Sequence, residues 1–89
     1  MGECEVKAKK GLIRVIAKKD DNKIKNISIT GDFMVFPEDV IWELEKKLIG
    51  VNSRKEDIRN VLNEILKNAN LLGSTIDDFL DVIMCSLEA

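Results

Sequence analysis

The hydrophobic pattern of this chain changes its period once, near Pro37, and that change constrains the fold more than any other feature of the sequence. Before it, apolar and polar residues alternate, as in Ile27–Thr30, which is typical of strands with one buried face. After it, apolar residues recur at helical spacing. Because all predicted strands precede all predicted helices, we expect an α+β fold: a three-stranded antiparallel meander followed by three helices packed on one face.

Short turns separate the three predicted strands. The strands cover residues 3–9, 12–19 and 24–30, with turn sequences at 9–11 and 20–23. The face expected to join the core collects Cys4, Val6, Ala8, Ile13, Val15, Ala17, Ile27 and Ile29. The opposite face is expected to carry Leu12, Arg14, Ile16, Ile24, Asn26 and Ser28.

The expected helices have recognisable ends. The first begins at Pro37, whose φ suits the first helical position, and ends before Gly50. Capping boxes open the other two helices, and residues 68–73 between them break the helical pattern. The boxes are Ser53 with Glu56 and Thr75 with Asp78. All 89 residues are expected to form a single domain, 1–89, because a chain of this length closes one core.

Composition argues against a reaction centre in this chain. Histidine and tyrosine are absent, which removes the commonest general base and any histidine-activated nucleophile. A carboxylate or lysine would need a deep cleft to tune its pKa, and so small a domain has little depth. We therefore expect no catalytic residue and no activity from the chain alone.

Charge, cysteine usage and hydropathy indicate the expected classes of partner, the redox state of the cysteines and the cellular location. The net charge of −2 argues against binding nucleic acid or membranes by charge alone. Cys4 and Cys85 lie near opposite ends without metal-ligand spacing, so no metal site is predicted and both are interpreted as reduced. No signal peptide is recognised, and no apolar run approaches the ~18 residues of a membrane span. The expected location is cytoplasmic.

Two stretches are candidates for binding. Gly31, which can adopt positive φ, precedes the carboxylate of Asp32 and the ring of Phe33. We expect Asp32 first to accept hydrogen bonds from free N–H groups before Pro37, and thereby to shape the loop.

The second candidate is the outer sheet face. Leu12, Ile16 and Ile24 are either scattered surface residues or, as we favour, one docking patch flanked by Arg14. Trp42, which lies off the apolar stripe of its helix, either covers the edge of the core or anchors an interface.

Several stretches of the chain, in order, resemble the C-terminal accessory domain of lipoate-protein ligases. The resemblance covers roughly residues 8–50 by motif and the remainder by helical pattern. Met34 stands where many members have a second aromatic residue. The matching stretches are Lys10-Gly11-Leu12-Ile13-Arg14, Ile24 to Ile29 leading into Thr30-Gly31-Asp32-Phe33, Pro37-Glu38, and Leu44-Glu45 with Leu48 and Gly50.

The resemblance implies a supporting role. In such ligases a large domain binds ATP and lipoate, forms lipoyl-adenylate and passes the lipoyl group to a lysine of an acceptor protein. The accessory domain supports adenylation, and in some archaea and bacteria it is a separate chain. An 89-residue chain beginning with Met fits that arrangement, so the expected assembly is a heterodimer with a separate catalytic chain, and acceptor proteins are indirect partners.

The resemblance also assigns the ligands and the loop residues. ATP, Mg²⁺ and lipoate would lie in the partner's active site, and this chain alone would bind no cofactor. The set expected near the partner or its nucleotide, named here the corner set, is Lys10, Gly11, Gly31, Asp32 and Phe33.

Two alternatives stay open. Iron–sulfur scaffolds of the NifU and SufE type resemble this order of strands and helices, but they need several thiolate ligands and the chain has two cysteines. A simple interaction module that dimerises through the outer sheet face is the other.

Overall fold

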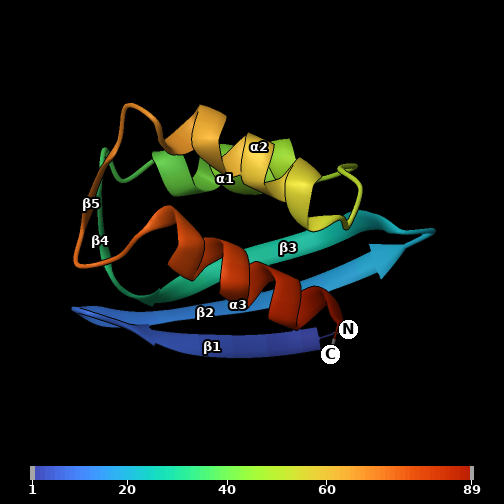
Figure 1. Ribbon diagram of the computed structural model, residues 1–89, viewed down its shortest axis with the longest axis horizontal. Coiled ribbons are helices and arrows are strands. Elements are labelled where there is room, and N and C mark those ends of the chain that lie inside the picture. The colour runs from blue at the N-terminus through green and yellow to red at the C-terminus, as the bar shows by residue number, and fades with distance from the viewer. Residues whose placement is uncertain (1, 89) are drawn as a thin grey trace.

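The computed structural model describes residues 2–88, so Met1 and Ala89 of the predicted domain lie outside it. Three strands form an antiparallel sheet in the order β1-β2-β3, and the three helices follow in the sequence (Figure 1). The predicted α+β fold is confirmed. The elements are β1 (Gly2–Ala8), β2 (Gly11–Asp20), β3 (Lys23–Asp32), β4 (Met34–Phe36), α1 (Val40–Leu48), α2 (Lys55–Leu66), β5 (Asn70–Leu72) and α3 (Ile76–Glu88).

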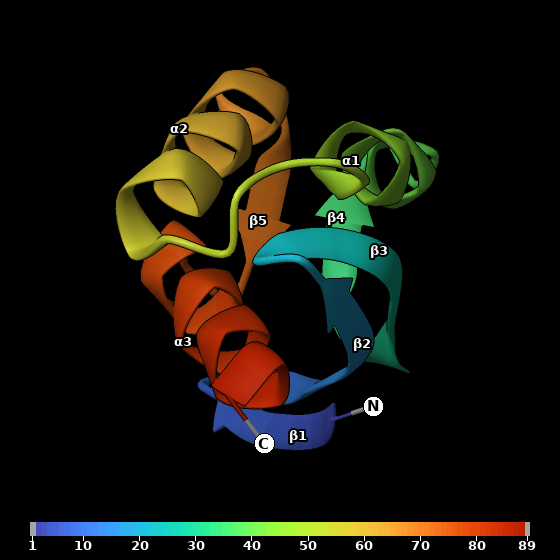
Figure 2. The same ribbon diagram turned by 90° about the vertical axis from the view of Figure 1, so that its right-hand side faces the viewer.

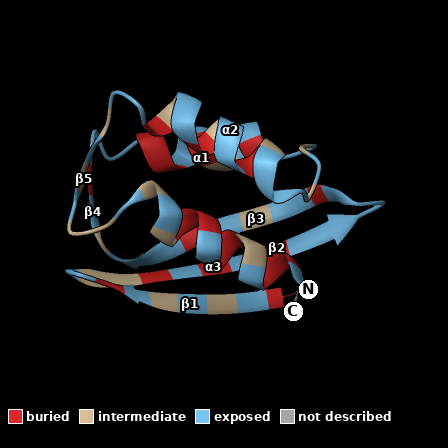
Figure 3. Ribbon diagram, in the orientation of Figure 1, coloured by how far each residue is buried: buried red, intermediate tan, exposed pale blue. Residues whose placement is uncertain are grey.

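The three-stranded sheet curves around one helix. Figure 2 shows α3 lying against β1 and β2, with α1 beside β3 and α2 resting on both other helices. Figure 3 shows that each helix carries its buried and exposed residues on different sides. The centre of the core consists of side chains with no exposed surface, and these are Ile13, Val15, Leu44, Leu48, Ile58, Leu62, Phe79, Leu80 and Ile83.

The turn between β2 and β3 forms as the sequence predicts. Asp21 and Asn22 adopt φ values of 54° and 62°, the left-handed conformation that suits a two-residue hairpin. The strands then pair Val15 with Ile29. The prediction that Val15 and Ile29 point toward the core is therefore correct.

One face assignment is wrong: Ile24 lies in the core, with 1% of its surface exposed. The cause is a β-bulge, because Lys18 pairs with Asn26 while the next residue, Lys19, pairs with Ile24. The extra residue, Lys25, inverts the alternation of side chains beyond it. Ile24 therefore turns inward, and it cannot belong to an exposed docking patch.

The predicted helix starts are correct in one case of three. At α3, the Thr75 N–H donates to the Asp78 carboxylate at 2.9 Å and the Asp78 N–H donates to the Thr75 hydroxyl at 3.1 Å, as a capping box requires. The box predicted at Ser53 does not form, because α2 begins after Arg54 without a side-chain cap. Helix α1 begins at Val40 rather than Pro37.

A second, two-stranded sheet is absent from the sequence prediction. Strand β4 pairs antiparallel with β5, and each strand has three residues. Strand β4 occupies the stretch expected to lead into a helix, and β5 occupies the predicted break at 68–73. The pairs are Met34 with Leu72, Val35 with Leu71, and Phe36 with Asn70.

The cysteines are joined, so the prediction that they are reduced is wrong. A disulfide links Cys4 of β1 to Cys85 of α3, whose Cα atoms lie 5.9 Å apart. The two residues are 81 positions apart in the sequence. Their proximity is produced by the packing of α3 on β1, which local patterns do not report.

Candidate functional site

Two glycines of the corner set hold β2 and β3 close together at one end of the sheet. Gly11 has φ +146° and Gly31 has φ +141°, conformations that side chains rarely adopt. A Cβ atom on Gly11 would overlap the carbonyl oxygen of Asp32, and one on Gly31 would overlap that of Leu12. The close approach of the two strands therefore requires glycine at both positions.

A third segment joins this end of the sheet. The N–H of Lys10 donates to the carbonyl of Gly73, directly after β5, at 3.1 Å. A Cβ atom on Gly73 would overlap the side chain of Lys10. One packed unit thus forms from three segments: the turn between β1 and β2, the link from β3 to β4, and the residues after β5.

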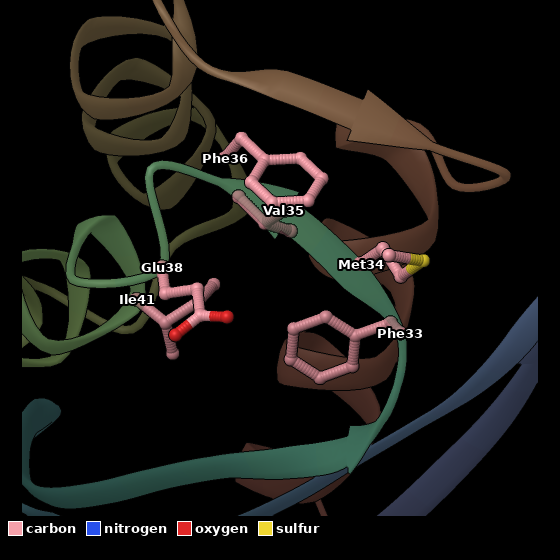
Figure 4. Close-up of a pocket in the computed structure, with 6 residues that line it drawn as sticks. All are labelled: Phe33, Met34, Val35, Phe36, Glu38 and Ile41. Carbon is pink, nitrogen blue, oxygen red and sulfur yellow. The ribbon is translucent and has the colours of Figure 1, made fainter.

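Phe33 anchors this unit to the core. Its ring meets the fully buried ring of Phe79 edge to face, with centroids 5.4 Å apart and an interplanar angle of 89°. Figure 4 shows Phe33 pointing into the bend between β3 and β4, toward the side where Glu38 and Ile41 lie. The structure therefore brings the five residues of the corner set together at one end of the sheet, and their functional role stays a prediction.

The cap predicted for Asp32 is wrong. The Asp32 side chain is exposed and accepts no hydrogen bond from any residue between 2 and 88. Asp32 contributes to the corner through its backbone carbonyl, which packs against Gly11. Its carboxylate is consequently available to solvent or to a partner.

An apolar surface next to the corner is missing from the sequence prediction. Because directly paired residues of antiparallel strands point to the same face, Met34 and Leu72 lie side by side, and Phe36 follows on that face. Their exposed fractions are 54%, 47% and 43%. We call Met34, Phe36 and Leu72 the apolar end.

A hollow of about 190 Å³ adjoins the apolar end (Figure 4). Glu38 lines this hollow and also a second one, which Trp42 lines as well. The first hollow is lined by Phe33, Met34, Val35, Phe36, Glu38 and Ile41.

The residues predicted as a docking face lie on different surfaces. Leu12, Arg14 and Ile16 share the outer face of the sheet, as expected, whereas Trp42 is on α1 and is 70% exposed. The Arg14 guanidinium donates to Glu5 at 2.9 Å. That hydrogen bond, together with the nearby negative charges, raises the pKa of Arg14. The outer face between Leu12 and Ile16 is thus occupied by an ion pair.

Across residues 2–88, no three or more His, Cys, Asp or Glu side chains are grouped so as to hold a metal ion. In the same range, no helix has the length and apolar character to cross a membrane.

Fold and site together define a small α+β domain with a closely packed corner and an exposed apolar surface, and such a surface is a feature of a domain that binds another protein. The chain matches the family described as the bacterial lipoate protein ligase C-terminus over residues 3–83, and it belongs to that family.

A relative from Thermoplasma acidophilum has the same domain. It is lipoate-protein ligase A subunit 2, 42% identical over 78 residues, which cover 86% of this chain and 81% of the relative. A chain in the solved structure of the bi-partite lipoate protein ligase and E2 lipoyl domain of that organism superposes with a TM-score of 0.84. It is 39% identical, and the match covers 91% of each chain.

Proposed function

We propose that this chain is the accessory subunit of a bipartite lipoate-protein ligase. It supports ATP-dependent formation of lipoyl-adenylate by a separate catalytic chain and performs no ligation alone. The observation that carries this conclusion is the similarity to subunit 2 of a ligase over most of both chains, in sequence and in fold.

The division of labour follows from the family. ATP and lipoate bind in the catalytic chain, and we place Mg²⁺ there with the nucleotide. Lipoyl-acceptor proteins meet the assembly through the catalytic chain. The site of action is the cytoplasm, where we expect the ligase to find its acceptors.

The corner set is proposed to lie near the partner or its nucleotide. Lys10 and Asp32 carry exposed charges where Gly11 and Gly31 let two strands pack closely, and binding residues are commonly placed on loops that a packed scaffold supports. One carboxylate beside phosphates needs a bridging cation, so Asp32 is better suited to contact the protein partner than the nucleotide.

The alternatives lack comparable support. The disulfide uses both cysteines, so no free thiolate for an iron–sulfur cluster is left among residues 2–88. Dimerisation through the outer sheet face is also less well supported, because Ile24, one of the three apolar residues expected on that face, is in the core.

Complex formation tests the proposal. Mixed with a catalytic chain that lacks its own C-terminal domain, this protein should co-elute on size exclusion as a heterodimer, with a dissociation constant in the micromolar range or tighter. Bovine serum albumin at equal concentration provides the negative control. Separate elution of the two folded chains at all accessible concentrations would contradict the proposed function.

A further inference from the structure

Exposed large apolar side chains are concentrated on one part of this molecule. Six such residues are exposed among residues 2–88, and three of them form the apolar end. Trp42 lines a second hollow, which shares Glu38 with the first. The other two, Ile16 and Ile49, line a separate hollow between β3 and α1.

Strand β4 has the composition of a strand covered on both faces. Val35 points inward and is 5% exposed, while its neighbours Met34 and Phe36 point outward and are also large and apolar. Apolar residues on both faces are typical of strands buried on both sides. One covering layer is supplied by the core, and no second layer is present among residues 2–88.

The main sheet of the same molecule provides the comparison. Its outer face is mostly polar, as a solvated sheet face should be. Ion pairs there join Arg14 to Glu5 and Glu3 at 2.9 and 3.8 Å. The outward residues, read from the strand register, are Glu3, Glu5, Lys7, Leu12, Arg14, Ile16, Lys18, Asn26, Ser28, Thr30 and Asp32. The face of the β4–β5 sheet therefore differs from the surface that this protein exposes to water elsewhere.

The size of this surface disfavours a second copy as its occupant. Strands β4 and β5 lie at one end of the longest axis (Figure 1). The whole molecule extends 22 × 19 Å across that axis, so a flat end face covers at most about 400 Å². A stable interface needs about 800 Å² from each partner. Two copies meeting end to end fall short, whereas a larger chain can also cover the corner and the Trp42 side of α1.

Charged residues lie beside the apolar end. Lys10 is held next to Leu72 through its bond to Gly73, and Glu38 lies beside Phe36 in the first hollow. An apolar centre with charged residues at its rim is the usual composition of a protein interface. The hollow beside Phe36 offers space for an apolar side chain of the partner.

We propose that the catalytic chain of the ligase docks on the apolar end, with Met34, Phe36 and Leu72 as its central contacts. This inference rests on the proposed function and adds the surface through which it operates. It replaces the outer sheet face, which the sequence favours, as the main docking surface.

Two matched substitutions test the location. Met34→Lys and Ile16→Lys each place a charge on an exposed apolar strand position, one at the apolar end and one on the outer sheet face. By isothermal titration with the catalytic chain, Met34→Lys should weaken binding about 30-fold or more, the change expected at an interface hot spot. Ile16→Lys should leave the dissociation constant within about threefold. Leu72→Lys repeats the test from β5, and circular dichroism melting verifies that each variant is folded.

The outcomes separate this inference from the function on which it rests. If the wild-type chain neither binds the catalytic chain nor supports adenylation, the proposed function fails. If the wild type binds but Ile16→Lys weakens binding while folded Met34→Lys and Leu72→Lys do not, only the docking surface is overturned. A wild-type chain that dimerises alone, and becomes monomeric with Met34→Lys, would assign the apolar end to a second copy and also overturn the inference.

Discussion

Replacing Cys4 and Cys85 together by serine should lower the free energy of unfolding by about 4.5 kcal/mol, because the disulfide closes a loop across almost the whole chain. Cross-linking distant residues reduces the conformational entropy of the unfolded chain, and the effect grows with loop length. A domain of this size has on the order of 5–10 kcal/mol of total stability, so about half would be lost. Urea unfolding followed by circular dichroism measures the difference.

Reduction provides the control. Wild-type protein in dithiothreitol should unfold at the same urea concentration as the double variant, and its melting temperature should fall by on the order of 20 °C. Equal stability of the oxidised wild type and the double variant would show that the bridge contributes nothing. In a reducing cytoplasm such a bridge is uncommon, although intracellular proteins of hyperthermophiles retain them.

Gly31→Ala should destabilise the protein by about 3 kcal/mol, combining the cost of positive φ with that of an overlap in a packed site. Its φ is +141°, and the added methyl group would meet the backbone carbonyl of Leu12, which cannot move without disturbing the pairing of β2 and β3. Thermal and urea unfolding measure this change.

Gly50→Ala is the matched control. Gly50 also has positive φ, +86°, but a Cβ atom there meets nothing within 4 Å. Its substitution should cost about 1 kcal/mol or less, from the backbone conformation alone. If the two variants were equally stable, the close approach at Gly31 would not hold the corner together.

Local patterns were sufficient for most of the fold. The alternation in β2 and in the part of β3 after Lys25, the Asp21-Asn22 turn and the apolar stripes of the helices are each encoded within about ten residues of sequence, and each is observed. The Thr75–Asp78 cap is equally local. Features of this kind can be predicted because the residues that determine them are neighbours in the chain.

The errors concern residues whose partners are distant. Strand β4 forms because residues 70–72 lie beside it, and Cys4 finds Cys85 because α3 packs on β1. The bulge at Lys25 is a property of strand pairing, and a single extra residue moved Ile24 from the predicted outer face to the core. Alternation alone does not reveal it.

The two parts of the candidate site, the corner set and the apolar end, differ in how far local sequence indicates them. The residues of the corner set stand in two short stretches of the sequence, and the structure brings these stretches together, while their role in binding stays a prediction. The apolar end was missed because Met34 and Phe36 precede a helix and Leu72 lies in a break between helices. Only the pairing of β4 with β5 places the three on one face.

The central claim is tested most directly by measuring lipoyl-adenylate formation from lipoate and ATP, with the two chains separate and combined. We expect no adenylate from this chain alone, little from a catalytic chain that lacks its C-terminal domain, and full formation when the two are mixed in equal amounts. Met34→Lys should require a higher concentration to reach the same rate, and Ile16→Lys should match the wild type. Full adenylate formation by the catalytic chain without this protein would contradict the account.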